Sequence, residues 1–254
     1  SAIFRAGGNI NNLDNSLLHK GDMAAFVECH IEQGRNLFDK GNSIGLVNCI
    51  TGIYREEIEV DGESNHAGTT LMRNRHDAFL ASAEAALALE KTIIAQGSDK
   101  IVGTVGKISI EPNAPNIISG KAKFVMEIRT QDDDIKNRIL NIFTCLLNNI
   151  SRNRGVLFTR KIILNQEFVC MSPIVMNAIN SCSKEKLMVM PSMAGHDSVH
   201  MTNIAPTGML FVQSIEGMSH CAEERTEIKD ICVAGNTLLH TILKLDEILD
   251  KNEC

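Results

Sequence analysis

The sequence predicts an α/β protein that is interrupted by an inserted α+β domain. The segment 53–167 has the order strand, helix, strand, strand, helix, strand, which is typical of a ferredoxin-like module. The flanking segments 1–52 and 168–254 instead alternate apolar strands with helices, as α/β domains do. We therefore expect two domains, one of which is assembled from both ends of the chain.

The elements of the inserted domain follow from their hydrophobic periodicity. Apolar residues alternate with acids in its first strand, and its first helix is rich in Ala and Leu at helical spacing. Three consecutive acids begin its second helix, where a helix N-terminus favours negative charge. The predicted elements are a strand over 54–63, a helix over 75–94, strands over 100–110 and 121–131, a helix over 132–150 and a strand over 156–166.

The charge balance excludes some classes of partner. The 254 residues include 25 basic and 31 acidic side chains, and the net charge is -6. Nucleic acids and anionic membranes select basic surfaces, so we expect neither as a partner. No run of about 18 apolar residues predicts a membrane span. Eight dispersed cysteines without a C-x-x-C motif indicate reduced thiols and a cytoplasmic protein.

Four histidines occur in polar, glycine-rich segments that are typical of loops: His30, His66, His196 and His220. A single histidine is usually a surface or packed residue, but four of them at strand-to-loop edges indicate a functional site. The pair His196 and His200 has i,i+4 spacing but lacks the Glu of H-E-x-x-H, so chance explains it better. Nucleotide-binding and serine-hydrolase motifs are absent from the sequence. Spacing alone indicates an enzyme and leaves its metal dependence open.

Seven segments resemble one known family and occur in that family's order over nearly the whole chain. The family is the amidase and carbamoylase branch of the zinc-aminopeptidase-like metallohydrolases, which includes allantoate amidohydrolases and N-carbamoyl-L-amino-acid hydrolases. The resemblance implies a partial zinc-aminopeptidase-like catalytic domain that carries a ferredoxin-like lid or dimerisation domain. The segments are HIEQG (30–34), GESNHAGTT (62–70), MRNRHDA (72–78), TVGKISIEPNAPNIISG (104–120), EIRTQD (127–132), AGHDS (194–198) and GMSHCAEERT (217–226).

The resemblance also implies roles for individual residues. His30 and His220 are expected to bind metal in a site for two divalent ions, either zinc or manganese. His66 is expected to act catalytically by stabilising an oxyanion in the partner subunit's site. Asn116 and Arg129 are expected to hold the substrate carboxylate. The residues expected to line the substrate pocket are Gln33, Gly195 and His196. Glu224 is expected to orient His220.

The implied reaction is hydrolysis of a ureido C–N bond beside a carboxylate-bearing carbon. Two segments, GESNHAGTT and FVQSIEGMSHCAEERTEIKDI, are most similar to allantoate amidohydrolases of purine catabolism, which release ureidoglycine, ammonia and carbon dioxide. The alternative within the family is an N-carbamoyl-L-amino-acid hydrolase. A homodimer formed through the lid domain is the expected assembly.

Part of the family's metal site is not found in this sequence. No H-x-D motif precedes His30, and the two Glu-Glu pairs, at 56–57 and 223–224, lie outside the expected context. We therefore expect a family member that lacks its N-terminal portion, with an incomplete metal site and no assignable general base. Two hypotheses follow: a fragment of an active metallohydrolase, or an inactive homologue that acts only through dimerisation.

Overall fold

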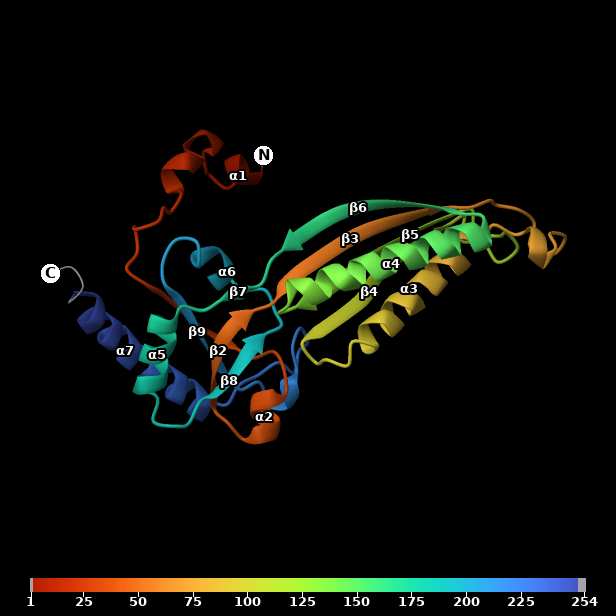
Figure 1. Ribbon diagram of the computed structural model, residues 1–254. Coiled ribbons are helices and arrows are strands. Elements are labelled where there is room, and N and C mark those ends of the chain that lie inside the picture. Colours follow the sequence, from red (N-terminus) through yellow and green to blue (C-terminus); the bar gives the residue numbers. More distant parts are fainter. Residues whose placement is uncertain (1, 251–254) are drawn as a thin grey trace. The chain divides into compact units, whose positions relative to one another are not determined.

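The computed structural model describes residues 2–250, which form two compact units (Figure 1). One unit contains the described residues up to Ile50 and from Val169 onward, and the other is Thr51–Phe168. Each unit has its own β-sheet and its own apolar core. The predicted mixed α/β fold class is confirmed, whereas the roles of catalytic domain and lid domain stay predictions.

The first unit, which we call the split unit, is built on a mixed sheet with the strand order β1-β9-β2-β7, and β8 also pairs with β2. Strands β1 and β9 are parallel, and β2 is antiparallel to β9 and parallel to β8. The elements are α1 (Ala2–Arg5), η1 (Ile10–Ser16), β1 (Phe26–Ile31), α2 (Asn36–Lys40), β2 (Ile44–Ile50), β7 (Val169–Cys170), α5 (Pro173–Cys182), β8 (Met188–Ser192), α6 (Ser198–Met201), β9 (Thr207–Val212), η3 (Ile215–Gly217) and α7 (Ile228–Asp250).

The two faces of this sheet bury different residues because side chains alternate along each strand. Leu210 of β9 packs with residues of α5 and α7, whereas Phe211 packs in a second cluster that contains Leu37 of α2 and Val199 of α6. Along β1, Glu28 is paired with Met209 and His30 with Phe211. Glu28 and His30 therefore lie on the sheet face that α6 covers.

The second unit, which we call the inserted unit, has a four-stranded antiparallel sheet with the order β4-β5-β3-β6. Two long helices, α3 and α4, cover one face of this sheet (Figure 1). The strand and helix order is the βαββαβ order of ferredoxin-like modules. Its elements are β3 (Gly52–Asp61), η2 (Met72–Asn74), α3 (Ala78–Ile94), β4 (Ile101–Glu111), β5 (Lys121–Thr130), α4 (Asp133–Arg154) and β6 (Leu157–Gln166).

Local capping sets the ends of the two long helices. Asp77 is extended and accepts a hydrogen bond from the backbone N–H of Leu80, so α3 begins at residue 78 rather than 75. Asp132 caps α4 in the same way. Gly155 adopts φ +63 and ends α4, which therefore extends four residues beyond the predicted end at residue 150.

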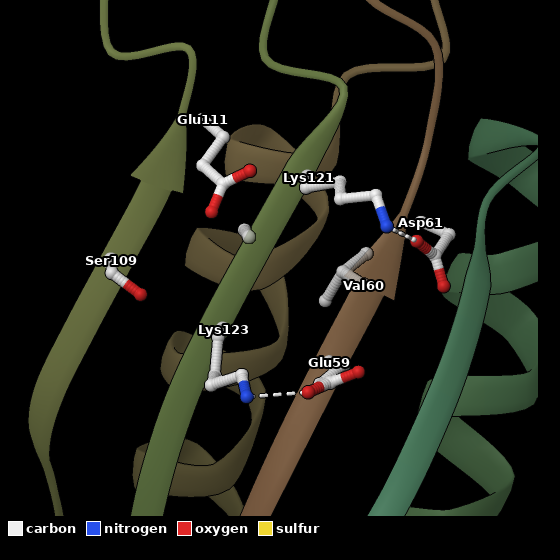
Figure 2. A pocket seen from close by; sticks show the side chains of 8 residues that line it. Glu59, Val60, Asp61, Ser109, Glu111, Lys121 and Lys123 are labelled. Atoms are coloured by element: carbon white, nitrogen blue, oxygen red, sulfur yellow. Dashed lines mark ion pairs between the residues drawn. The ribbon is translucent and has the colours of Figure 1, made fainter.

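The open face of the inserted sheet carries exposed ion pairs between neighbouring strands. A hollow of about 230 Å³ is lined there by eight residues, including Glu59, Asp61, Lys121 and Lys123 (Figure 2). The ammonium of Lys123 lies 2.5 Å from a carboxylate oxygen of Glu59, and that of Lys121 lies 3.4 Å from Asp61. These charges face one another across the strands in solvent, where such ion pairs contribute little to stability.

The described residues bear on two further predictions. The seven cysteines within 2–250 are free thiols. None of the helices in this range is long and apolar enough to cross a membrane.

Candidate functional site

His30 lies on β1 and has one of its two ring nitrogens occupied. Its Nδ1 atom is 2.8 Å from the backbone carbonyl oxygen of Ile31, which can only accept a hydrogen bond. Nδ1 must therefore carry the proton, and the neutral ring has its lone pair on Nε2. This tautomer is the one that leaves Nε2 available to a metal ion.

Glu28 brings the loop before α6 next to His30. Its Oε2 atom accepts hydrogen bonds from the backbone N–H of Ser198 at 2.9 Å and from the hydroxyl of Ser198 at 2.6 Å. This connection places His196 beside both β1 residues. The rings of His30 and His196 meet edge to face with centroids 4.6 Å apart, and His196 Nδ1 lies 3.7 Å from Glu28 Oε1.

The imidazole of His196 is buried and uncharged near neutral pH. Its side chain is 1 % exposed. Burial, together with the neighbouring His30, lowers the pKa of His196 to about 4, although Glu28 and Asp197 oppose this shift. Its Nε2 atom lies 2.7 Å from the hydroxyl of Ser192, whereas its buried Nδ1 atom has no hydrogen-bond partner among the described residues.

Glu28, His30 and His196 together form the group of potential metal ligands that the described residues provide. One ligand atom from each lies within 4.8 Å of the other two. Two imidazoles and a carboxylate suit zinc or manganese, and the buried Nδ1 atom of His196 has no hydrogen-bond partner among the described residues. The residues therefore fit a divalent metal ion. Within residues 2–250, His220 does not join this group.

His220 lies instead beside Gln33, on two loops that pack together. The side-chain nitrogen of Gln33 is 3.5 Å from His220 Nε2, and the backbone N–H of Gln33 donates to the buried hydroxyl of Ser214. Glu224 accepts a hydrogen bond from the backbone N–H of His220 at 2.6 Å. Glu224 thus fixes the backbone of the loop that carries His220 and does not contact the imidazole through this bond.

Both loops contain residues with left-handed backbone conformations. Gln33 and His220 each have φ +58, which is uncommon for residues with side chains. Gly217 has φ +67, and a Cβ atom there would lie 2.8 Å from the carbonyl carbon of Gly34. The close approach of the loops therefore requires glycine at 217. Gly195 lies next to His196, in the loop between β8 and α6.

In the inserted unit, His66 and Asn116 are brought together by paired loop backbones. His66 forms an isolated β-bridge with Ile117, and the backbone N–H of Ala67 donates to the carbonyl of Asn116 at 2.9 Å. The guanidinium of Arg75 donates to the carbonyl oxygens of Ala67 and Thr70, at 2.5 and 3.1 Å. The β-bridge and the Ala67 bond hold the His66 loop against the loop of Asn116, and the Arg75 bonds stabilise the turn within the His66 loop.

The tautomer of His66 is set by its own loop. The backbone N–H groups of Gly68 and Thr69 lie 3.0 and 3.3 Å from His66 Nδ1 and donate to it. Nδ1 is therefore the acceptor, and the neutral ring carries its proton on Nε2. His66 is exposed, so this Nε2–H is available to donate a hydrogen bond outward.

Arg129 lies on β5, far along the strand from the His66 loop. It is eight residues from Lys121, where the loop of Asn116 joins β5, a distance of about 26 Å at roughly 3.3 Å per residue. Its Nε donates to Glu127 at 2.7 Å. Burial raises the pKa of Glu127, but hydrogen bonds from Arg129 and Arg55 and their charges outweigh it and leave that pKa lowered.

The split unit offers a group of residues that could hold a metal ion, and comparison with known proteins gives the family. The sequence profile described as peptidase family M20/M25/M40 matches residues 6–244. The chain belongs to this family.

Similar proteins include several amidohydrolases. A ureidoglycolate hydrolase of Oryza sativa subsp. japonica is 39% identical over 239 residues, which are 92% of this chain and 49% of that protein. An allantoate amidohydrolase of Escherichia coli (strain K12) is 37% identical over 237 residues, or 90% of this chain and 56% of that protein. A crystal structure of AtUAH in complex with (S)-hydroxyglycine superposes with a TM-score of 0.87 at 34% identity, covering 94% of this chain and 58% of that one.

The chain therefore spans about half the length of the curated relatives that it matches. The residue roles implied by the family resemblance stay predictions for His30, His66, Asn116, Arg129 and His220.

Proposed function

We propose that the protein containing this chain hydrolyses the ureido C–N bond of a small carboxylate with the help of divalent metal ions. The observation that carries this proposal is the convergence of Glu28, His30 and His196 on one point, in a chain that belongs to a hydrolase family. Allantoate is the first proposed substrate. Ureidoglycolate is the second, since the relative from Oryza sativa bears the name ureidoglycolate hydrolase.

The residues of the split unit would hold the metal and one side of the substrate. His30 offers Nε2, and the resemblance adds His220 to a site for two ions, zinc or manganese. A divalent cation held there would supply Lewis-acid polarisation of the ureido carbonyl and a hydroxide near neutral pH. Gln33, which lies 3.5 Å from His220, is placed to donate an amide hydrogen bond to a substrate at this site.

The inserted unit would stabilise the developing charge. The Nε2–H of His66 is the donor that its loop fixes, and a preorganised donor of this kind stabilises an oxyanion. Arg129 and Asn116 would bind the substrate carboxylate. In the overall reaction, water adds to the ureido carbon, the C–N bond breaks with loss of ammonia, and the remaining carbamate releases carbon dioxide to leave an amine.

The separation of Arg129 from the His66 loop supports a homodimer. Arg129 lies about 26 Å along β5 from Lys121, where the loop of Asn116 that pairs with the His66 loop joins the strand, so the two loops and Arg129 are too far apart to contact a single small substrate from the same chain. We propose that each active site receives His66 and Asn116 from one subunit and Arg129 from the other.

The proposal is tested by a substrate panel on the protein at its full natural length. Ammonia release is measured for allantoate, ureidoglycolate and an N-carbamoyl-L-amino acid, before and after treatment with a chelator and re-addition of zinc or manganese. Metal-dependent turnover of allantoate or ureidoglycolate is expected. Turnover of the N-carbamoyl amino acid alone would reassign the substrate, and no turnover of any compound would leave dimerisation as the function.

A further inference from the structure

We propose that Arg75 is a positioning residue for His66 and acts on it through one peptide group, the one between Ala67 and Gly68. The guanidinium of Arg75 donates a hydrogen bond to the carbonyl oxygen of Ala67, and the N–H group of the same peptide, that of Gly68, donates to His66 Nδ1. The catalytic consequence of this arrangement rests on the proposed function, whereas its effect on the imidazole can be measured without any reaction.

The first argument is the geometry of this peptide group. The peptide bond between Ala67 and Gly68 is trans and planar, so its C=O and N–H bonds point in opposite directions. Arg75 Nη2 lies 2.5 Å from the carbonyl oxygen of Ala67 on one side, and the nitrogen of Gly68 lies 3.0 Å from His66 Nδ1 on the other. A side chain that holds the carbonyl therefore also directs the N–H group at the imidazole.

The second argument is the charge of the donor. A guanidinium stays protonated under physiological conditions, and a hydrogen bond from a charged donor is roughly twice as strong as one between neutral groups. Because donation to a carbonyl polarises the amide, the N–H group of Gly68 becomes a better donor to His66 Nδ1. Arg75 thereby favours the neutral tautomer of His66 that carries its proton on Nε2.

The third argument is that the guanidinium is itself held in place. Arg75 Nε donates to the carbonyl oxygen of Thr70 at 3.1 Å, so the planar fork engages two carbonyls of one turn. The backbone N–H of Thr70 closes that turn by donating to the carbonyl of His66 at 3.2 Å. The next residue, His76, donates from Nδ1 to the carbonyl oxygen of Arg154 at the end of α4, at 2.9 Å. Arg75 therefore connects the His66 turn to the helices of the inserted unit.

The first experiment observes the His66 imidazole by nitrogen NMR of the isotope-labelled 254-residue chain at mildly alkaline pH. In the wild-type chain, Nε2 should carry the proton and the amide of Gly68 should exchange slowly with solvent. Arg75→Gln should bring the shifts of the two ring nitrogens closer together, because both tautomers become populated, and should speed exchange of the Gly68 amide by ~10-fold or more. Arg73→Gln, at an exposed arginine of the same segment, is the matched control and should change neither signal.

The spectrum of His66→Ala assigns the imidazole signals, and the melting temperature of each chain checks folding. Arg75→Lys serves if Arg75→Gln does not fold. It keeps the charge but offers one ammonium to two carbonyls, so the Gly68 amide should still exchange faster than in the wild-type chain, by a smaller factor. A wild-type ring with its proton on Nδ1 would overturn the inference, as would wild-type ring shifts and exchange in the folded Arg75 variant.

The second experiment measures steady-state kinetics of the full-length protein. Arg75→Gln should lower kcat by about 10–100-fold and leave KM nearly unchanged, because a displaced oxyanion donor acts mainly in the transition state. The same substitution should have no further effect in a protein that already carries His66→Ala. An equal loss of kcat with and without His66 would contradict a role through His66. If the protein hydrolyses none of the proposed substrates, the NMR result still decides the role of Arg75, and the proposed function alone fails.

Discussion

The two units each carry a histidine, and the surroundings of the two rings differ in burial and in hydrogen bonding. In the split unit, His196 is buried, and its free nitrogen faces a carboxylate and another imidazole. In the inserted unit, His66 is exposed, and two backbone N–H groups satisfy its Nδ1. The first arrangement leaves a buried ring nitrogen without a hydrogen-bond partner among the described residues, and the second leaves an Nε2–H that can donate to an anion. The surroundings of each ring, not the residue type, therefore decide which of its nitrogen atoms stays available.

The largest expected effect is in the inserted unit, at Arg129. In the full-length enzyme, Arg129→Ala should raise KM for carboxylate substrates by an amount equivalent to about 2–5 kcal/mol, because the substrate loses a charged partner. Steady-state kinetics checks this. Arg55→Ala is the matched control, since Arg55 also pairs with Glu127. Equal effects of the two substitutions would assign Arg129 to sheet stability instead.

The next effect concerns His66 as a hydrogen-bond donor. His66→Ala should lower kcat by about 10²–10³-fold and change KM little, because an oxyanion donor acts mainly in the transition state. The neighbouring exposed residue Arg73 supplies the control Arg73→Ala. If His66→Ala changes KM and leaves kcat unaltered, His66 binds the ground state and the contrast with His196 weakens.

A smaller effect is expected from the packed loops of the split unit. Gly217→Ala should lower the free energy of unfolding by about 2–4 kcal/mol, since a Cβ atom meets Gly34 and φ is +67. Gly41→Ala isolates the backbone strain, because Gly41 also has φ +67 but a Cβ atom there would meet no atom within 4 Å. Gly41→Ala should lower the free energy of unfolding by about 1 kcal/mol, and urea unfolding measures both variants. The same loss in both variants would show that the loop contact is not tight.

The smallest effect is a pH dependence in the inserted unit. The pKa of Glu127 is lower in the folded state, so its contribution to stability is present above its unfolded pKa and is lost as pH falls through the folded pKa. Glu127→Gln should therefore lower the free energy of unfolding by about 1 kcal/mol at pH 7 and leave it unchanged in strong acid. Urea unfolding at pH 7 and in strong acid measures this difference in stability.

The control for Glu127 is the exposed ion pair on the same sheet. Glu59→Gln removes the partner of Lys123 in solvent (Figure 2), and the unfolding midpoint should not move. A pH-dependent loss in Glu59→Gln as large as that in Glu127→Gln would show that the hydrogen bonds from Arg129 and Arg55 to Glu127 are not the cause.

Much of the fold could be predicted because its signals are local. The Ala- and Leu-rich segment forms α3, and alternating residues form β3, since helical and strand periodicities are written in neighbouring positions. The predicted ends of the helices were less accurate. Asp77 and Gly155 decide them through a capping bond and a left-handed φ, and both depend on the three-dimensional path of the backbone.

The sequence by itself determined which histidines occur in loop-like segments, and the family resemblance added roles for them. It did not identify Glu28, although the i,i+2 spacing of Glu28 and His30 on a strand was a usable sign that both share one face. Only the tertiary structure decided that His196 lies beside His30 and that His220 lies beside Gln33. Sheet register and loop packing join residues that are far apart in the chain, and no local pattern encodes such contacts.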